Sequence, residues 1–167
     1  AQTKKGHFIG TCCWFLNKQD RIDNFYHSEP IHTRGFWFFH LKSYNFDWNT
    51  LADLESLKIG GLGGASYQKE FDKRVKAGKL RMMHLDSVEQ GFRLLMKGRI
   101  DLCLFDKATG YAVIKKEGGT MTDKFTHHKK SLVETPTHLL FSKADAEKST
   151  NYRDLFNQGL EKLKQSG

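Results

Sequence analysis

Residues of three kinds in this sequence could together hold a small charged molecule. Arg21 carries a guanidinium, whose parallel N–H groups can hold a carboxylate in a two-point contact. Gly64, Ala65 and Ser66 lie between an apolar run and a helical pattern, and the backbone N–H groups at such a helix start attract an anion. Asp106 directly follows an apolar run of strand length, and ligands of open α/β sheets collect beyond strand ends. Asp106 is therefore the first candidate for a ligand contact.

Each of these residues also has a purely structural interpretation. Ser66 could be an ordinary helix cap, Arg21 an exposed arginine in a polar turn, and Asp106 the cap of the helix that follows it. The glycine loop matches neither G-x-G-x-x-G nor a phosphate-binding P-loop, because no Gly-Lys-Ser/Thr follows it. The three features therefore gain weight only if the fold positions them together.

The stretch from residue 88 to residue 106 indicates how Asp106 would be positioned. Apolar residues recur at helical spacing at Val88, Phe92, Leu95 and Met96. Gly98 follows, where a helix ends in a left-handed residue, and residues 100–105 then form a short apolar run. A helix, a glycine stop and a buried strand closed by a carboxylate make half of an α/β crossover unit.

The same alternation continues on both sides of this stretch. Strands are predicted at 57–62, 80–85, 100–105 and 137–142, and helices at 67–76, 108–116 and 146–164. Upstream, residues 7–16 read as a buried strand, 17–23 as a polar turn that holds Arg21, and the aromatic run 35–41 as a central strand. The order predicts an α/β fold with a mostly parallel sheet flanked by helices.

Composition restricts the classes of function. The 167 residues carry a formal net charge of +8, which allows acidic partners, but the basic residues are scattered and form no clear nucleic-acid footprint. No apolar run approaches the ~20 residues needed to span a bilayer. We expect no nucleic-acid partner.

Cysteines and histidines give no sign of a cofactor or a catalytic centre. Three cysteines do not make a disulfide framework, and adjacent Cys12 and Cys13 would form only a strained bridge. None of the eight histidines forms H-x-x-x-H or lies near C-x-x-C, so we expect neither a metal nor another cofactor. Only His27 and Glu29 could act as an acid or base near the proposed ligand site, and we expect no enzyme activity.

With these residues located, the sequence resembles the family 3 extracellular solute-binding proteins, the polar amino-acid class of ABC transporters. The matching segments are Arg21 with Phe25-x-x-Ser28-Glu29-Pro30, Asp47-Trp48-x-x-Leu51-x-Asp53-Leu54, Ile59-Gly60-x-x-x-Gly64-Ala65-Ser66-Tyr67, the helix that ends in Gly98-Arg99-Ile100-Asp101 with its strand to Asp106, and His138-Leu139-Leu140-Phe141-Ser142-Lys143 followed by Phe156-Asn157. The resemblance covers nearly the whole chain. The order of several moderate motifs is more specific than any single one.

The resemblance implies a periplasmic-binding-protein-like type II fold, with a complete second lobe and an incomplete first lobe. It implies that residues 1–34 form the remainder of lobe 1 and the hinge, 35–130 lobe 2, and 131–167 the return to lobe 1 with a C-terminal helix. The family's first strands have no counterpart before Ala1. The chain is therefore expected to be either part of a longer protein or a shortened relative, without a signal peptide of its own.

The resemblance also implies a role for each candidate residue. Arg21 would pair with a ligand α-carboxylate, Ser66 with the backbone at Gly64 and Ala65 would hold the same group, and Asp106 would accept the α-ammonium. An anion site and a lone carboxylate together suit a zwitterion. Lys18 stands where the family usually has threonine, and this extra cation favours an anionic or otherwise different ligand.

The expected function is therefore that of a periplasmic component of an ABC-type importer. It would bind a small polar solute, an amino acid or a small anion, between two hinged lobes and deliver it to a membrane permease. The alternative is an extracytoplasmic ligand-sensing domain of a signalling receptor. A transmembrane segment beyond residue 167 in a parent chain would favour the receptor.

Overall fold

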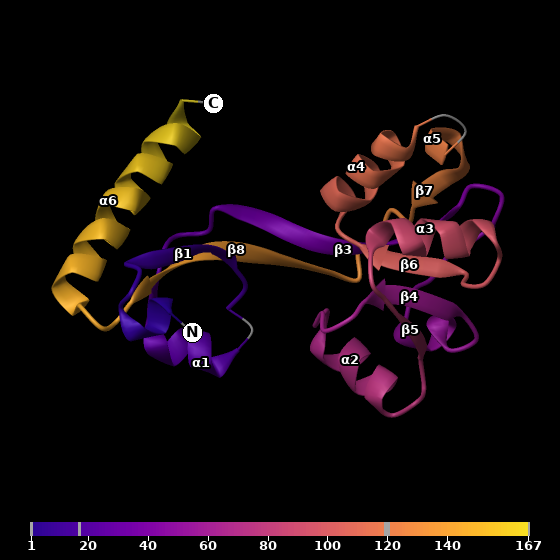
Figure 1. The fold of residues 1–167 in the computed structure, drawn as a ribbon, viewed down its shortest axis with the longest axis horizontal. Helices are drawn as coiled ribbons and strands as arrows, with labels where there is room; N and C mark the ends of the chain where they lie inside the picture. Colours follow the sequence, from indigo (N-terminus) through magenta and orange to yellow (C-terminus); the bar gives the residue numbers. More distant parts are fainter. Residues whose placement is uncertain (1, 17, 119–120, 167) are drawn as a thin grey trace. The chain divides into compact units, whose positions relative to one another are not determined.

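The chain forms two compact units. The computed structural model describes residues 2–16, 18–118 and 121–166. The central unit is Gly35–Glu134, and the terminal unit combines Ala1–Arg34 with Thr135–Gly167. The chain passes from one unit to the other twice, within strand β3 (His32–Leu41) and within strand β8 (Val133–Ser142) (Figure 1).

The central unit is built on a mixed sheet. Its strands lie in the order β3, β6 (Leu102–Phe105), β4 (Lys58–Leu62) and β5 (Arg81–Leu85). Strand β4 runs parallel to both β5 and β6, as the strand–helix alternation predicts. Strand β3 is antiparallel to β6 and also to β7 (Phe125–His127). The parallel part is thus as expected, whereas the sheet as a whole is not mostly parallel, because β3 enters from the other unit.

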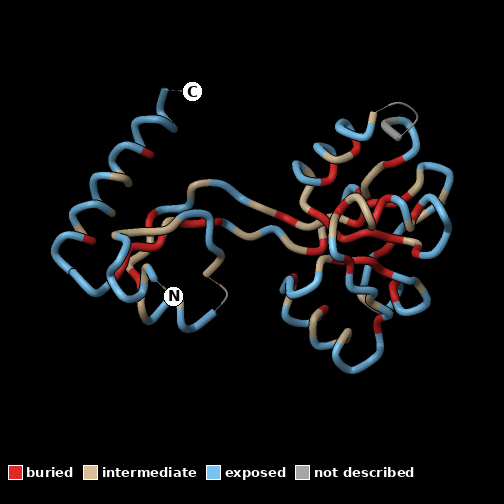
Figure 2. The backbone as a smooth tube through the Cα atoms, viewed as in Figure 1, coloured by how far each residue is buried: buried red, intermediate tan, exposed pale blue. Residues whose placement is uncertain are grey.

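Helices cover both faces of this sheet. Its helical segments are η2 (Leu51–Leu54), α2 (Lys69–Lys76), α3 (Val88–Met96), α4 (Lys107–Glu117) and the short α5 (Met121–Lys124). Successive strand residues point to opposite faces, so Phe38 and Leu104 pack with Phe71 of α2, while Phe39 and Phe105 pack with Phe92 of α3. All five of these ring side chains and Leu104 are at most 2% exposed. Figure 2 shows the buried residues along these strands.

The terminal unit has a smaller sheet with one long helix. Strand β8 pairs antiparallel with β1 (Gly10–Trp14) and with β2 (Phe25–His27), and helix α6 (Ala146–Gln165) packs against β2. Helices η1 (Thr3–Lys5) and α1 (Gln19–Asn24) complete it. Its exposed large apolar side chains are Phe8, Trp14, Ile22, Tyr152, Leu155 and Leu163. This unit therefore buries its apolar surface much less completely than the central unit does.

Two predictions in the terminal unit were wrong. The strand predicted as buried over 7–16 is limited to Gly10–Trp14, and its last three residues are exposed because β1 lies at the edge of the sheet. Residues 19–23, predicted as part of a polar turn, belong to helix α1, and Asn17 lies outside the described residues. This helix is short and buries no residue, so it has no apolar periodicity that would reveal it.

None of the helices within residues 2–16, 18–118 and 121–166 combines the length and the apolar character that crossing a membrane requires.

Shortening Phe92 should destabilise the central unit strongly. Its ring is fully buried and contacts the rings of Phe39, Phe105 and Phe125. Phe92→Ala should lower the free energy of unfolding by about 3–5 kcal/mol, measured by urea denaturation followed by far-ultraviolet circular dichroism. Met96→Ala on the same helix is the control. Because Met96 is 42% exposed, this variant should lower the free energy of unfolding much less. Equal losses in the two variants would contradict this description of the core.

Candidate functional site

Arg21 and Lys18 line one hollow of the terminal unit. The hollow has a volume of about 650 Å³, and Phe8, Trp14 and Phe25 contribute to its wall. Arg21 lies in α1, and its guanidinium carbon is 4.5 Å from the centroid of the Trp14 ring. One guanidinium N–H donates to the carbonyl of Phe15 at 2.8 Å. Burial lowers the pKa of Arg21, yet the group stays charged at neutral pH.

The charge of this hollow is mainly positive. Lys18 is the residue before α1, and its carbonyl accepts the Arg21 N–H at 3.0 Å, so the two cations lie one turn apart. Lys4 and Asp20 also line the hollow and form an exposed ion pair at 2.6 Å. The hydrogen bond from Lys4 lowers the pKa of Asp20. A carboxylate is the ligand group that such a hollow suits best.

The second group of candidates follows strand β4 in the central unit. Gly64 has a φ of +74°, a conformation that glycine adopts without strain, and Ala65 N–H donates to the carbonyl of Leu62 at 3.3 Å. Ala65 and Ser66 line a hollow of about 300 Å³ between α2 and β5. Its other lining residues are Tyr67, Asp72, Val75, Lys76, Met82 and His84.

Ser66 is not the cap of helix α2, as its structural interpretation supposed. The cap is Gln68, whose side-chain oxygen accepts the N–H of Phe71 at 3.2 Å. The Ser66 hydroxyl instead donates to Asp72 at 2.8 Å, and the N–H of Tyr67 donates to the other Asp72 oxygen at 3.3 Å. A carboxylate from the protein itself therefore accepts from two donors of the loop that precedes this helix.

Asp106 caps helix α4. Its side chain accepts the N–H of Thr109 at 2.9 Å and is half-buried. Strands β4 and β6 are parallel neighbours, with Gly61 opposite Leu104. The loop that holds Ser66 and the residue Asp106 therefore both follow the carboxyl ends of their strands, on the same side of the sheet. The structure thus brings Gly64, Ala65, Ser66 and Asp106 to one edge of the central unit. That Arg21 and Lys18 converge with them on one ligand stays a prediction.

Sequence reasoning missed an aromatic and cationic cluster beside Asp106. The Lys107 ammonium lies 4.2 Å from the centroid of the Trp37 ring, and the Tyr111 hydroxyl lies 2.6 Å from Nδ1 of His127. Burial, with a smaller contribution from Lys107, lowers the pKa of His127. Trp37 belongs to the aromatic run predicted as a central strand, and it is only half-buried. The i, i+4 spacing of Lys107 and Tyr111 indicates in the sequence only that these two side chains share one helix face. Their proximity to Trp37 and His127 depends on the pairing of β3 with β6 and β7, which the sequence does not reveal.

Among the residues that the structure describes, no group of three or more histidine, cysteine, aspartate and glutamate side chains could hold a metal ion.

Comparison with known proteins identifies the fold. No protein-family model matches the sequence, and no curated protein matches it. Solved structures match over most of the chain. A lysine complex from Wolinella succinogenes, described as a binding component of an ABC transporter, gives a TM-score of 0.73 at 18% identity, over 99% of this chain and 68% of that one. The chain has part of the fold of a type II periplasmic binding protein.

Two further structures agree with this fold. A mutant of ArgBP from T. maritima matches with a TM-score of 0.65 at 22% identity, over 90% of this chain and 60% of its own. The GluR0 ligand-binding core from Nostoc punctiforme, in complex with L-glutamate, matches with a TM-score of 0.66 at 18% identity, over 99% of this chain and 71% of its own. The chain therefore spans less than two thirds of the ArgBP chain.

Removing the Asp106 side chain should weaken helix α4 independently of any ligand. Asp106→Ala deletes the acceptor of the Thr109 N–H and should lower the free energy of unfolding by about 1 kcal/mol. Asp106→Asn keeps a capping oxygen and should lose less than half of that. Urea denaturation of both variants measures the difference, and equal losses would show that a side-chain oxygen at residue 106 is not what stabilises the start of α4. Binding experiments therefore need the asparagine variant.

Proposed function

We propose that this chain is the solute-binding part of an ABC-type importer and that it binds an amino acid or a related small polar compound. The observation that carries the proposal is the shared fold, since a structure with lysine and one with L-glutamate are among those that match. The charged groups of each unit support it. The terminal unit offers cations in a hollow, and the central unit offers Asp106 at a sheet edge.

Each candidate residue has a role in this proposal. Arg21 holds the solute carboxylate, and Lys18 adds positive charge one turn away. Asp106 accepts the solute ammonium, and Ser66, with the backbone of Gly64 and Ala65, contacts the solute from the central unit. Binding makes and breaks no covalent bond, so no catalytic residue is proposed. The solute stabilises a closed arrangement of the two units only if it contacts both of them.

The protein partner and the location follow from the same proposal. A membrane permease of an ABC transporter receives the solute, and the chain acts outside the cytoplasm, in the periplasm. The low identities to the matching structures, 18–22%, make the identity of the solute the first question for experiment.

Thermal-shift measurements on the whole chain test the proposal. L-arginine, L-lysine, L-glutamate and L-glutamine should be tried at millimolar concentration, and one of them should raise the melting temperature. A ligand at 100 times its Kd stabilises the folded state by about 2.7 kcal/mol. Arg21→Ala and Asp106→Asn should abolish the shift because each removes one charged partner of a zwitterion.

Arg99→Ala is the matched control for these variants. Arg99 is an exposed arginine of the central unit that lines neither of the two hollows, so its loss should leave the shift unchanged. The proposal fails if no amino acid shifts the melting temperature, or if Arg21→Ala and Arg99→Ala respond alike.

A further inference from the structure

We propose that Asp72 is a built-in competitor that fills the position at Ser66 and Tyr67 where a solute carboxylate would bind. The central unit would then admit a neutral or cationic N–H group beside Ser66 and reject a carboxylate. This inference rests on the proposed function, because it concerns which part of the solute faces the central unit. It assigns the solute carboxylate to Arg21 and Lys18 alone.

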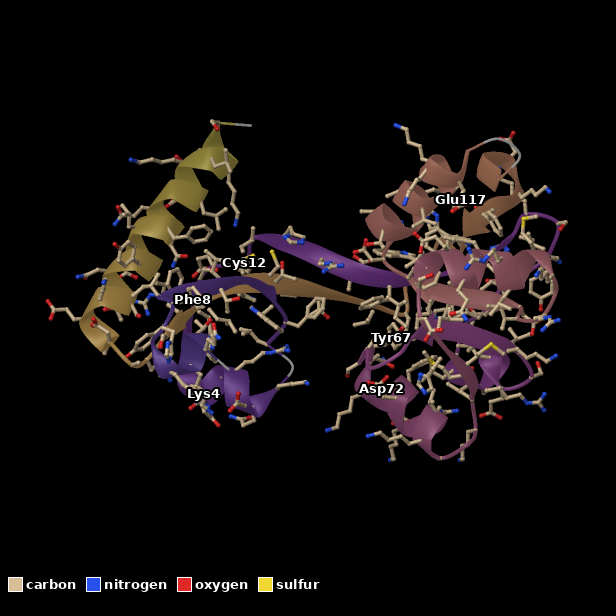
Figure 3. All side chains as sticks on the ribbon, viewed as in Figure 1. Lys4, Phe8, Cys12, Tyr67, Asp72 and Glu117 are labelled. Atoms are coloured by element: carbon tan, nitrogen blue, oxygen red, sulfur yellow. The ribbon has the colours of Figure 1, made fainter. Side chains whose placement is uncertain are left out.

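The geometry of Asp72 is that of a bound anion. Its two carboxylate oxygens accept from two donors, the Ser66 hydroxyl at 2.8 Å and the Tyr67 N–H at 3.3 Å. Both donors lie just before helix α2, where aligned backbone dipoles favour negative charge. A carboxylate that arrived from solution would find these donors taken and a like charge a few ångströms away. Figure 3 labels Tyr67 and Asp72 on this part of the central unit.

The fold does not need Asp72 as a helix cap. Gln68 already caps α2 through Phe71, and the Asp72 N–H makes the ordinary helical bond to the Gln68 carbonyl at 2.8 Å. The Asp72 carboxylate turns back toward the loop before α2, and its charge also suits the start of the helix. One of its partners, Ser66, is a residue to which the resemblance assigns ligand binding, and the other, the Tyr67 N–H, follows it directly in the chain.

A second observation indicates that the hollow beside Asp72 accepts a ligand group. The Tyr67 side chain lines this hollow and is 7% exposed, and its hydroxyl makes no well-formed hydrogen bond among the described residues, although the Leu62 backbone lies near enough to lower its pKa slightly. The hydroxyl lies over Gly61, where an added Cβ would come within 2.6 Å of it. Burial raises the pKa of Tyr67 to about 12, so the phenol keeps its proton at neutral pH. A buried hydroxyl without a partner is costly unless a ligand or water satisfies it.

The other polar side chains of the hollow limit which ligand groups fit. Lys76, one turn after Asp72, and His84 on β5 also line it. Lys76 offsets part of the Asp72 charge, which is why a neutral amide donor is admitted as well as an amine or a guanidinium. The carboxylate of Asp106 at the same sheet edge adds to the preference against anions.

Acetate binding to the whole chain, followed by ¹H–¹⁵N NMR at the amides of Ser66 and Tyr67, tests the inference. Sodium acetate is titrated against sodium chloride at equal ionic strength. The native chain should show no saturable shift at these amides. Asp72→Ala should bind acetate at least about tenfold more tightly, because a like charge and a competing acceptor are both removed.

Glu70→Ala is the matched control, since Glu70 lies on the same helix and its carboxylate contacts Arg74 at 3.3 Å instead. This variant should behave like the native chain. If Asp72→Ala does not fold, Asp72→Asn keeps the shape, removes the charge and should still bind acetate more tightly than the native chain. Equal acetate affinities of native and Asp72-substituted chains overturn the inference, as does a gain in Glu70→Ala of the same size.

The acetate titration separates this inference from the proposed function. It needs no amino acid, so a gain in the Asp72 variant together with a failed amino-acid screen would reject the proposed function and keep the inference. A positive amino-acid screen without a gain in acetate affinity would reject the inference about Asp72 and keep the proposed function.

Discussion

The parallel pairing of β4 with β6 is the constraint on which the central unit's site depends. It places the end of β4, with its glycine loop, beside the end of β6, with Asp106. The pairing is maintained by burial on both faces, because Phe38 and Leu104 face one core while Phe39 and Phe105 face the other. A one-residue slip of register would move these side chains to the wrong faces and would displace both loops. The core is thus also the support of the site.

The charges of the two units differ in sign where ligand contacts are proposed. Lys18 and Arg21 line a hollow of the terminal unit, whereas the central unit offers the carboxylates of Asp72 on α2 and Asp106 after β6, each with a lysine nearby (Lys76 and Lys107). This division suits a solute that has a carboxylate and at least one N–H donor. If Asp72 excludes carboxylates from its side, the solute carboxylate is left to the cations of the terminal unit. The Arg21 guanidinium carbon lies 4.5 Å from the centroid of the Trp14 ring, so a cation–π contact restricts its position.

Much of the central unit could be predicted because its elements carry strong local patterns. The helix at Val88–Met96 has its apolar stripe, Ser87 as the cap and Gly98 with a φ of +60°. The fold class could be predicted from the order of motifs. Helix α1 could not, since a six-residue polar helix depends on its surroundings rather than on periodicity. The contact between Asp72 and Ser66 was also missed, because a side chain that turns back six residues matches no short motif.

The central proposal is that Arg21 of one unit and Asp106 of the other bind the same solute molecule. The most direct measurement is an NMR titration of the ¹⁵N-labelled chain with L-arginine, observing the Arg21 side-chain Nε–H and the Thr109 amide that reports on Asp106. The account predicts that both signals shift and fit a single dissociation constant. Shifts confined to one unit, or two different dissociation constants, would contradict it.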